Sequence, residues 1–246
     1  MTILAIDSSG LVASVAIWAD GRLIGEFTTN FKKTHSQTLL PMLDHLMETV
    51  GMPLEACDAI AVSAGPGSFT GLRIGSATAK GLGLALDLPI IEVPTVDAIA
   101  YNFFGTDRVI CPLMDAKRQQ VYTGLYTFRQ DQLVVLSQQK AVPVEEILLE
   151  INERKQPVIF TGDGVPVYQD VIRENCRVPF SFAPAHLAAQ RAGALASLAA
   201  TYWNDEGKQD RIVRAADHVP DYLRLSQAER ELAAKKAEQK QLEDLP

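Results

Sequence analysis

The segment over residues 61–75 constrains the fold more than any other part of the chain. Apolar residues over 58–63 predict a buried strand, and a glycine-rich loop then leads into a helix predicted over 71–86. Such a turn presents backbone N–H groups and the positive end of a helix dipole. It can therefore hold an anion, but the same geometry also lets two backbones approach closely.

The loop fits none of the common phosphate or nucleophile motifs. A GxGxxG pattern fails because Thr70 stands at its sixth position, and a Walker A pattern fails because Lys80 lies far beyond the loop. GxSxG fails because Phe69 follows Ser68. Anion binding by the loop remains one of two alternatives, and its candidate residues are Gly65, Pro66, Gly67, Ser68, Phe69, Thr70, Gly71 and Arg73.

A stripe of small residues follows on the predicted helix, where Gly71, Gly75, Ala79 and Gly83 recur every four residues. Glycine inside a helix costs about 1 kcal/mol relative to alanine, so close packing must compensate. That packing is either internal or against a partner. The preceding helix, predicted over 36–50, carries surplus apolar residues, which favours a partner. The candidate partner surface comprises His35, Ser36, Leu39, Leu40, Met42, Leu43, Met47, Gly71, Gly75, Ala79 and Gly83.

The order of predicted elements indicates two similar α/β halves. Three strands with a hairpin turn at Asp20-Gly21 open the chain, and helices alternate with strands up to residue 103. The pattern repeats from residue 108, and a helix is predicted over 186–204. We expect a first half over 1–105, completed by a long helix within 186–206, a second half over 106–185, and a charged tail over 226–246.

Composition excludes several classes of protein. The 246 residues carry a net charge of −7, so a strongly basic nucleic-acid-binding face is not expected and a partner should hold any RNA. The three cysteines, Cys57, Cys111 and Cys176, have no CxxC spacing, which argues against disulfides and zinc. Neither a signal peptide nor a membrane span is apparent. We expect a cytoplasmic protein without membrane contact.

Carboxylates end a predicted strand in each half. Asp7 and Asp115 could face a cleft and hold magnesium or a nucleotide, or they could simply cap turns. The histidines, His35, His45, His186 and His218, are predicted to be caps or surface residues, and no metal site is predicted. The candidate cleft residues are Asp7, Ser8, Asp115, Arg118, Gly162, Asp163 and Gly164.

These motifs together resemble one family. Asp7-Ser8-Ser9, the run from His35 to Pro41, the glycine-rich segment to Gly75, and Asp115-Ala116-Lys117-Arg118 have the order and spacing of the bacterial TsaB (YeaZ) proteins, and Gly162-Asp163-Gly164 and Tyr222-Leu223-Arg224 continue the likeness. The resemblance implies a duplicated actin/Hsp70/sugar-kinase-like (ASKHA) fold. It also implies a role in making N6-threonylcarbamoyladenosine (t6A) at position 37 of tRNAs that read codons starting with A.

In that system the resemblance implies a non-catalytic scaffold, which binds the paralogous transferase TsaD and the ATPase TsaE and meets tRNA through the complex. The helices over 36–50 and 71–86 would form the surface for TsaD, or for a homodimer. TsaD relatives carry a metal-binding His-x-x-x-His where this chain has Thr95 and Ile99, and isoleucine cannot ligate a metal. We therefore expect no catalytic residues and no cofactor of its own, with ATP and Mg²⁺ only at the complex interface. The alternative is a small-molecule kinase or ATPase that uses Asp7 and Asp115.

Overall fold

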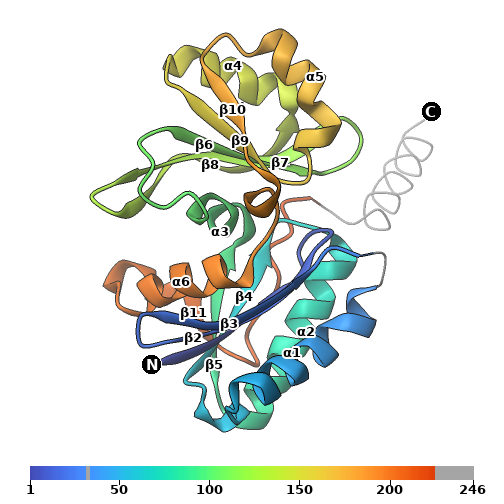
Figure 1. Ribbon diagram of the computed structural model, residues 1–246, viewed down its shortest axis with the longest axis vertical. Coiled ribbons are helices and arrows are strands. Elements are labelled where there is room, and N and C mark those ends of the chain that lie inside the picture. The colour runs from blue at the N-terminus through green and yellow to red at the C-terminus, as the bar shows by residue number, and fades with distance from the viewer. Residues whose placement is uncertain (32–33, 225–246) are drawn as a thin grey trace, which may run out of the picture.

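The computed structural model describes residues 1–31 and 34–224. The chain forms two α/β halves that lie one above the other along the long axis of the molecule, each built on one mixed β-sheet (Figure 1). The predicted charged tail over 226–246 lies outside the described residues. Within the described part, no helix is long and apolar enough to cross a lipid bilayer.

The first half opens with the three antiparallel strands that the sequence predicts. The hairpin between the second and third strands turns at Asp20 and Gly21, which both have positive φ, 48° and 81°. The later strands pair in parallel, because helices connect them. The elements are β1 (Thr2–Asp7), β2 (Ala13–Ala19), β3 (Arg22–Thr29), α1 (His35–Val50), the short turn η1 (Leu54–Ala56), β4 (Ala59–Gly65), α2 (Phe69–Leu86), β5 (Pro89–Pro94) and α3 (Thr95–Tyr101).

The second half repeats this plan. Its elements are β6 (Val109–Asp115), β7 (Gln120–Arg129), β8 (Gln132–Pro143), α4 (Val144–Arg154), β9 (Val158–Thr161), α5 (Val165–Asn175) and β10 (Phe180–Phe182). The first sheet runs in the order β3-β2-β1-β4-β5, with β11 (Ile212–Arg214) added at the edge, and the second runs β8-β7-β6-β9-β10. The identical strand order confirms the predicted duplication.

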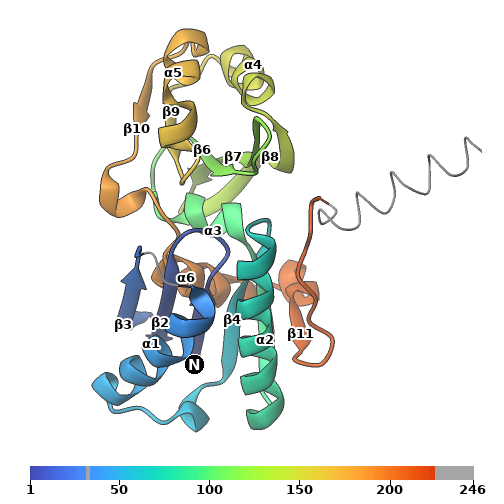
Figure 2. The same cartoon turned by 90° about the vertical axis from the view of Figure 1, so that its right-hand side faces the viewer.

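The core of the first half lies on both faces of its sheet. Side chains alternate along β1, so that Ile3 and Ala5 face one layer while Leu4 and Ile6 face the other. Helices α1 and α2 cover the face of Leu4 and Ile6, as the view from the side shows (Figure 2). Helices α3 and α6 (Ala192–Trp203) cover the opposite face.

Helix α3 joins the two halves. Val96 and Ile99 pack against Tyr126 of the second sheet, and the neighbouring Ala98 belongs to the core of the first. The buried Tyr126 hydroxyl donates to Asp97 Oδ1 at 2.8 Å, and burial raises the pKa of the Asp97 carboxyl. A polar contact inside this apolar layer fixes how α3 sits against the second sheet.

One prediction about the last third of the described chain is wrong, and two short strands were missed. The helix predicted from His186 begins at Ala192, and Ala185–Leu187 form a separate 3₁₀ turn, η2. The helix start is set by Glu26 of β3, whose carboxylate accepts from the Gly193 N–H at 2.9 Å, a distant contact that local sequence does not show. Strands β10 and β11 were not predicted, because three-residue strands carry no periodic signal.

Candidate functional site

The glycine-rich loop folds over the turn that follows β1. The Ser68 N–H donates to Ser9 O at 2.6 Å, and the Ser68 hydroxyl caps α2 by accepting from the Gly71 N–H at 3.3 Å. A Cβ atom on Gly67 would collide with Ser9 O, and one on Gly71 would collide with Ser8 O. Glycine is required at both positions because backbone, not a movable side chain, lies opposite. Close backbone approach is thus a demonstrated role of the loop.

Asp7 is buried completely at the centre of this arrangement. Its Oδ1 atom accepts from the Ser9 N–H at 3.0 Å and from the Ser9 hydroxyl at 2.6 Å, the turn-capping geometry that the sequence allowed. Its Oδ2 atom has no hydrogen-bond partner among the described residues. Burial raises the pKa of this carboxyl. Ser8 is held beside it, because its hydroxyl donates to Gly71 O at 2.8 Å.

The small-residue stripe of α2 faces the interior of the chain, so the prediction that it contacts a partner is wrong. Gly71, Gly75, Ala79 and Gly83 are all buried. A Cβ on Gly75 would lie 2.5 Å from Ser8 Oγ, and one on Gly83 would lie 2.7 Å from the Cβ of Ala215. The internal alternative is correct, because α2 needs bare backbone to lie this close to the β1 turn and to the C-terminal segment.

Helix α1 also buries most of its predicted partner residues. Leu39, Leu43 and Met47 point into the first core, and Met42 packs against the same cluster, so these residues do not form an outer surface. Leu40 differs, with 54% of its area exposed. Ser36 is exposed too, whereas His35 is partly buried, with Nε2 2.9 Å from Gly10 O.

The C-terminal strap, residues 215–224, runs along α2 toward the second half, as Figure 2 shows beside that helix. Lys80 donates from Nζ to Ala216 O and His218 O, both at 2.9 Å. Near the far end of the strap, the N–H of Asp221 donates to Ala64 O at 2.6 Å. The strap therefore covers part of α2, the helix on which the sequence predicted a partner.

A buried polar triad anchors the middle of the strap. The imidazole of His218 lies between Glu92 and Ser76, with Nδ1 2.6 Å from Glu92 Oε1 and Nε2 2.9 Å from Ser76 Oγ. His218 is 1% exposed, so the prediction of a surface or capping histidine is wrong for this residue. The order resembles the Ser–His–acid arrangement of hydrolases. Ser76 is itself buried in the middle of α2, where a substrate has no access, and the triad is a structural anchor.

A cleft of about 560 Å³ separates the two halves on the side of the glycine-rich loop. The first half contributes Ser9, Gly67 and Phe69, the second contributes Asp115 and Asp163, and the strap contributes Tyr222. Ser68 and Thr70 also line it. Of the predicted cleft residues, Asp7, Ser8, Arg118, Gly162 and Gly164 lie outside its lining.

The two carboxylates of the second half meet in this cleft. The Asp115 N–H donates to Asp163 Oδ1 at 3.2 Å, and burial raises the pKa of Asp163. Asp115 pairs with Lys117, whose Nζ lies 2.6 Å from Oδ2. Gly162 and Gly164 let this turn pass close to Leu113, since a Cβ on either glycine would meet the Leu113 backbone. The Asp115 carboxylate is therefore paired with a lysine of its own turn.

Comparison with known proteins identifies the family. A family model described as TsaD: tRNA N6-adenosine threonylcarbamoyltransferase matches residues 23–232. The tRNA threonylcarbamoyladenosine biosynthesis protein TsaB of Bacillus subtilis is 34% identical over 229 residues, which cover 93% of this chain and 96% of the relative. The chain belongs to the TsaB (YeaZ) family. The TsaB of Escherichia coli is 34% identical over 71% of this chain and 77% of its own length.

The structural likeness agrees with this family. YeaZ from Pseudomonas aeruginosa superimposes with a TM-score of 0.75 at 29% identity, covering 90% of this chain and 99% of that one. Together with the repeated strand order, this confirms the ASKHA fold that the TsaB resemblance implied. Membership of the TsaB family makes the chain a protein of t6A tRNA-modification biosynthesis.

This TsaB-family chain has no imidazole at the two positions where TsaD relatives carry their histidine pair. Thr95 and Ile99 open and close one turn of α3, and both are buried, at 0% and 1% exposure. Across residues 1–31 and 34–224, no group of three or more His, Cys, Asp or Glu side chains is placed to hold a metal ion. The site as described is therefore a cleft and a helical surface without a metal-binding cluster.

Proposed function

We propose that this chain is a non-catalytic subunit of the complex that installs t6A at position 37 of tRNAs reading codons that start with A. It would bind a TsaD-type transferase and a TsaE-type ATPase and meet tRNA within that complex. Its membership of the TsaB family supports the pathway. The exposed face of α2 supports the docking role, and this observation carries the proposal.

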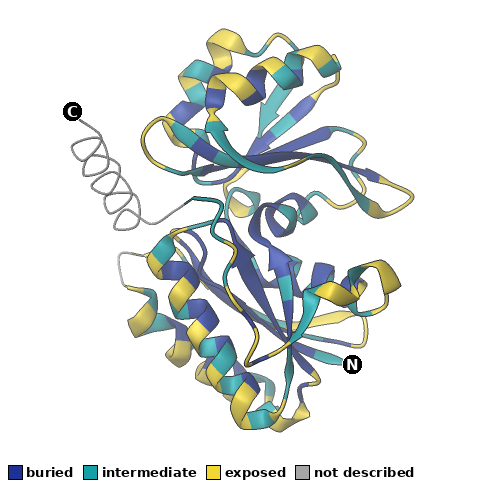
Figure 3. Ribbon diagram, turned by 180° about the vertical axis from the view of Figure 1, so that it is seen from behind, coloured by how far each residue is buried: buried dark blue, intermediate teal, exposed yellow. Residues whose placement is uncertain are grey.

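That face lies opposite the buried glycine stripe. It presents Ala77, Gly81 and Ala85 to solvent, together with Leu84, which is 61% exposed. A Cβ added to Gly81 would meet nothing within 4 Å, so no internal packing explains this glycine. Small exposed residues at this spacing let another helix approach closely. Viewed from behind, α1 and α2 show their exposed residues along the outer side of the first half (Figure 3).

Leu40 is an exposed apolar residue of the neighbouring helix α1. Its exposed side chain and that of Leu84 are apolar groups for which the described chain offers no cover. A homodimer in the absence of TsaD would use the same face, and so would compete with the complex. The exposed Ser36 stays a candidate for the edge of this surface, whereas the buried glycines support it from beneath and do not form its contact area.

The state of the two candidate carboxylates, Asp7 and Asp115, supports a non-catalytic role. Asp7 is fully buried and Asp115 is paired with Lys117, which leaves neither carboxylate free in the cleft. We propose that the chain carries no cofactor of its own and that ATP and Mg²⁺ bind only where it meets a partner. A small-molecule kinase or ATPase of the same fold is the rival, and it requires the isolated chain to bind Mg-ATP, which calorimetry measures directly.

A matched pair of leucines tests the docking face. Leu84 in the last turn of α2 and Leu149 in the middle of α4 are similarly exposed, 61% and 66%. We expect Leu84→Glu, and likewise Leu40→Glu, to weaken binding to a TsaD-type partner at least tenfold, while Leu149→Glu leaves it unchanged. All three variants should unfold within about 0.5 kcal/mol of the wild type, because the sites are exposed. Equal binding by Leu84→Glu and Leu149→Glu would reject this face.

A further inference from the structure

Positively charged side chains lie in and beside the cleft, with Lys117 and Arg224 in its lining, although the chain as a whole carries a net charge of −7. They form a row that Arg73 of α2 begins, Arg224 at the end of the strap continues, and Lys117 and Arg118 of the β6–β7 turn complete. We call these four residues the cleft rim. Two hydrogen bonds, from Arg73 to Tyr222 and from Arg224 to Ala116, link the segments that carry these residues.

The first link joins Arg73 to the strap. Its guanidinium lies over the Phe69 ring at 4.1 Å, and its Nε donates to the Tyr222 hydroxyl at 3.3 Å. Tyr222 stacks on the same phenylalanine, with ring centroids 4.5 Å apart. The two terminal nitrogens of Arg73 have no partner among the described residues. The guanidinium is thus held in place while its two outer N–H groups stay available, which suits a phosphate.

The second link crosses to the other half. Arg224 follows Tyr222 by two residues, a span of at most about 7 Å in extended chain. Its Nη1 donates to Ala116 O at 2.8 Å, and the next residues of the second half are Lys117 and Arg118. The rim therefore runs without interruption from α2 to the β6–β7 turn.

The turn that carries the last two cations has an unusual backbone. Lys117, Arg118 and Gln119 have φ values of 60°, 56° and 60°, so three successive residues other than glycine adopt the left-handed conformation. Each such residue costs roughly 1 kcal/mol, and backbone strain of this kind concentrates at binding sites. All three are exposed, and Arg118 makes no hydrogen bond or ion pair with any described residue. The strained turn thus carries an exposed arginine that has no partner among the described residues.

The acidic residues near the rim are already engaged. Asp115 pairs with Lys117, Asp163 accepts from a backbone N–H, and Asp221 accepts from Gln139 Nε2 at 3.0 Å. No carboxylate of the described chain pairs with Arg73, Arg118 or Arg224. The N-terminus of α2 also opens on the cleft beside Phe69 and Thr70, and adds a positive dipole end to the rim.

We infer that the cleft rim binds the phosphate backbone of an RNA strand, which is the tRNA if the proposed function holds. A row of cations that bridges two halves fits a polymer lying across it, whereas a mononucleotide would be held by enclosed residues. Arg73 and Arg118 are its exposed members, while Arg224 is half-buried and Lys117 is paired with Asp115. The aromatic pair fixes Arg73, so little of its side-chain freedom is lost on binding, whereas the strained turn fixes only the backbone of Arg118. This inference rests on the proposed function only for the identity of the RNA.

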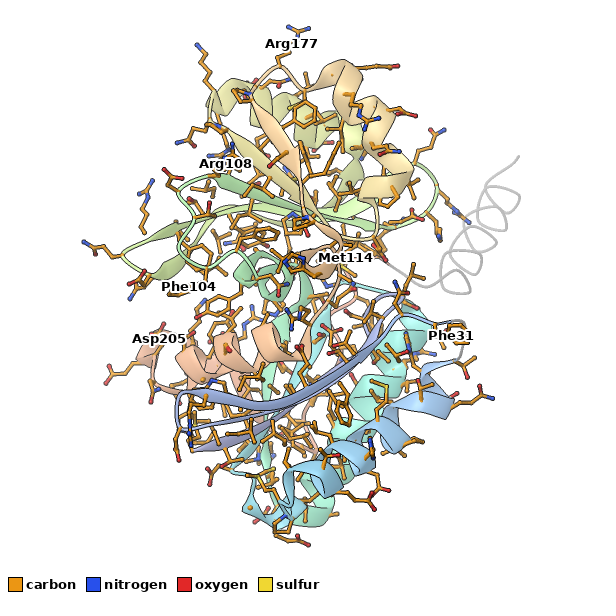
Figure 4. All side chains as sticks on the ribbon, in the orientation of Figure 1. Phe31, Phe104, Arg108, Met114, Arg177 and Asp205 are labelled. Carbon is orange, nitrogen blue, oxygen red and sulfur yellow. The ribbon has the colours of Figure 1, made fainter. Side chains whose placement is uncertain are left out.

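The experiment measures tRNA binding by the chain, alone and with its TsaD-type partner, as a function of salt concentration. Arg73→Gln/Arg118→Gln is compared with Arg129→Gln/Arg177→Gln, which removes the same charge from exposed arginines away from the rim; Arg177 lies at the far end of the second half (Figure 4). We expect the rim variant to bind roughly ten- to a hundredfold more weakly and its salt slope to fall by about 0.7 for each lost contact. The control should keep both values.

Equal affinity and slope for the two double variants would overturn the inference. Loss of AMP binding in the rim variant with unchanged tRNA binding would overturn it as well, because the rim would then hold a small ligand. Failure of the proposed function looks different. In that case the wild-type chain does not assemble with the transferase or is dispensable for modification, whatever the rim variant does to RNA binding by the chain itself.

Discussion

His218 and Glu92, which lie 126 residues apart in the chain, meet in the interior with Nδ1 2.6 Å from Oε1. The contact attaches the strap to β5, and the Ser76 hydroxyl completes it from α2 at 2.9 Å. The side chain of His218 is 0% exposed and that of Glu92 is 17% exposed. A single imidazole therefore connects three segments that belong to different parts of the sequence.

Removing this imidazole should loosen the strap. We expect His218→Ala to lower the free energy of unfolding by about 2 kcal/mol, since Glu92 and Ser76 would both lose their partner in the interior. His218→Gln, which can both donate and accept, should recover more than half of the loss. Urea denaturation of the three proteins measures this. A His218→Ala variant as stable as the wild type would show that the strap does not depend on the triad.

The same triad should be inert as a catalyst. Ser76 is 4% exposed, so an ester or peptide cannot reach its hydroxyl. We expect hydrolysis of an activated ester by the wild type to equal that by Ser76→Ala, with the variant losing about 1 kcal/mol of stability through the missing hydrogen bond. Hydrolysis that depends on Ser76 would contradict the assignment of the triad as a structural anchor.

The glycines of α2 should divide into two classes. Gly71→Ala places a Cβ against Ser8 O, and Gly83→Ala places one 2.7 Å from Ala215, so each should destabilise the fold by about 2 kcal/mol or more. Gly81→Ala meets open space and should stabilise the helix by up to about 1 kcal/mol. Thermal denaturation of the three variants checks the division. Similar effects at Gly71 and Gly81 would mean that the stripe does not pack internally.

The glycine stripe shows which features of α2 the sequence could predict and which it could not. Periodicity placed the stripe on one side of the helix and required a close neighbour for it, and both predictions are confirmed. It could not say that the neighbours are the Ser8 turn and Ala215, because Ala215 stands 132 residues beyond Gly83 and belongs to a segment with no recognisable pattern. The outer face with Gly81 was therefore overlooked.

The strap was missed for the same physical reason. Its hold on α2 depends on Lys80 binding two backbone carbonyls, and any residue type can offer a carbonyl. Tyr222-Leu223-Arg224 drew attention only through the family resemblance. Most strands and helices of both halves, in contrast, follow from short-range turns and side-chain periodicity and were predicted, except the short strands β10 and β11.

The buried Asp7 predicts a pH effect of definite sign. Burial raises its pKa above the ordinary value of 3.8, so the folded state binds this proton more tightly than the unfolded state does. The stability that the protonated carboxyl contributes is present below that value and is lost as the pH rises through the raised pKa. Asp7→Asn removes the charge but keeps an acceptor for Ser9.

We therefore expect the stability difference between Asp7→Asn and the wild type to grow with pH. The two proteins should unfold alike below about pH 4, and the variant should be more stable by about 1 kcal/mol or more at neutral pH, where the wild type buries a carboxylate with an unpartnered oxygen. Urea unfolding at a series of pH values measures this. A gap that shrinks as the pH rises would mean that Asp7 is stabilised as the anion.

The most direct test of the proposed role is reconstitution of the modification. Purified TsaD-type transferase, TsaE-type ATPase, threonylcarbamoyl-adenylate and tRNA are mixed with and without this chain, and t6A at position 37 is quantified. We predict that modification requires the wild-type chain, is lost with Leu84→Glu, and persists with Leu149→Glu. Equal yields of t6A with and without the chain would contradict its role as a required subunit.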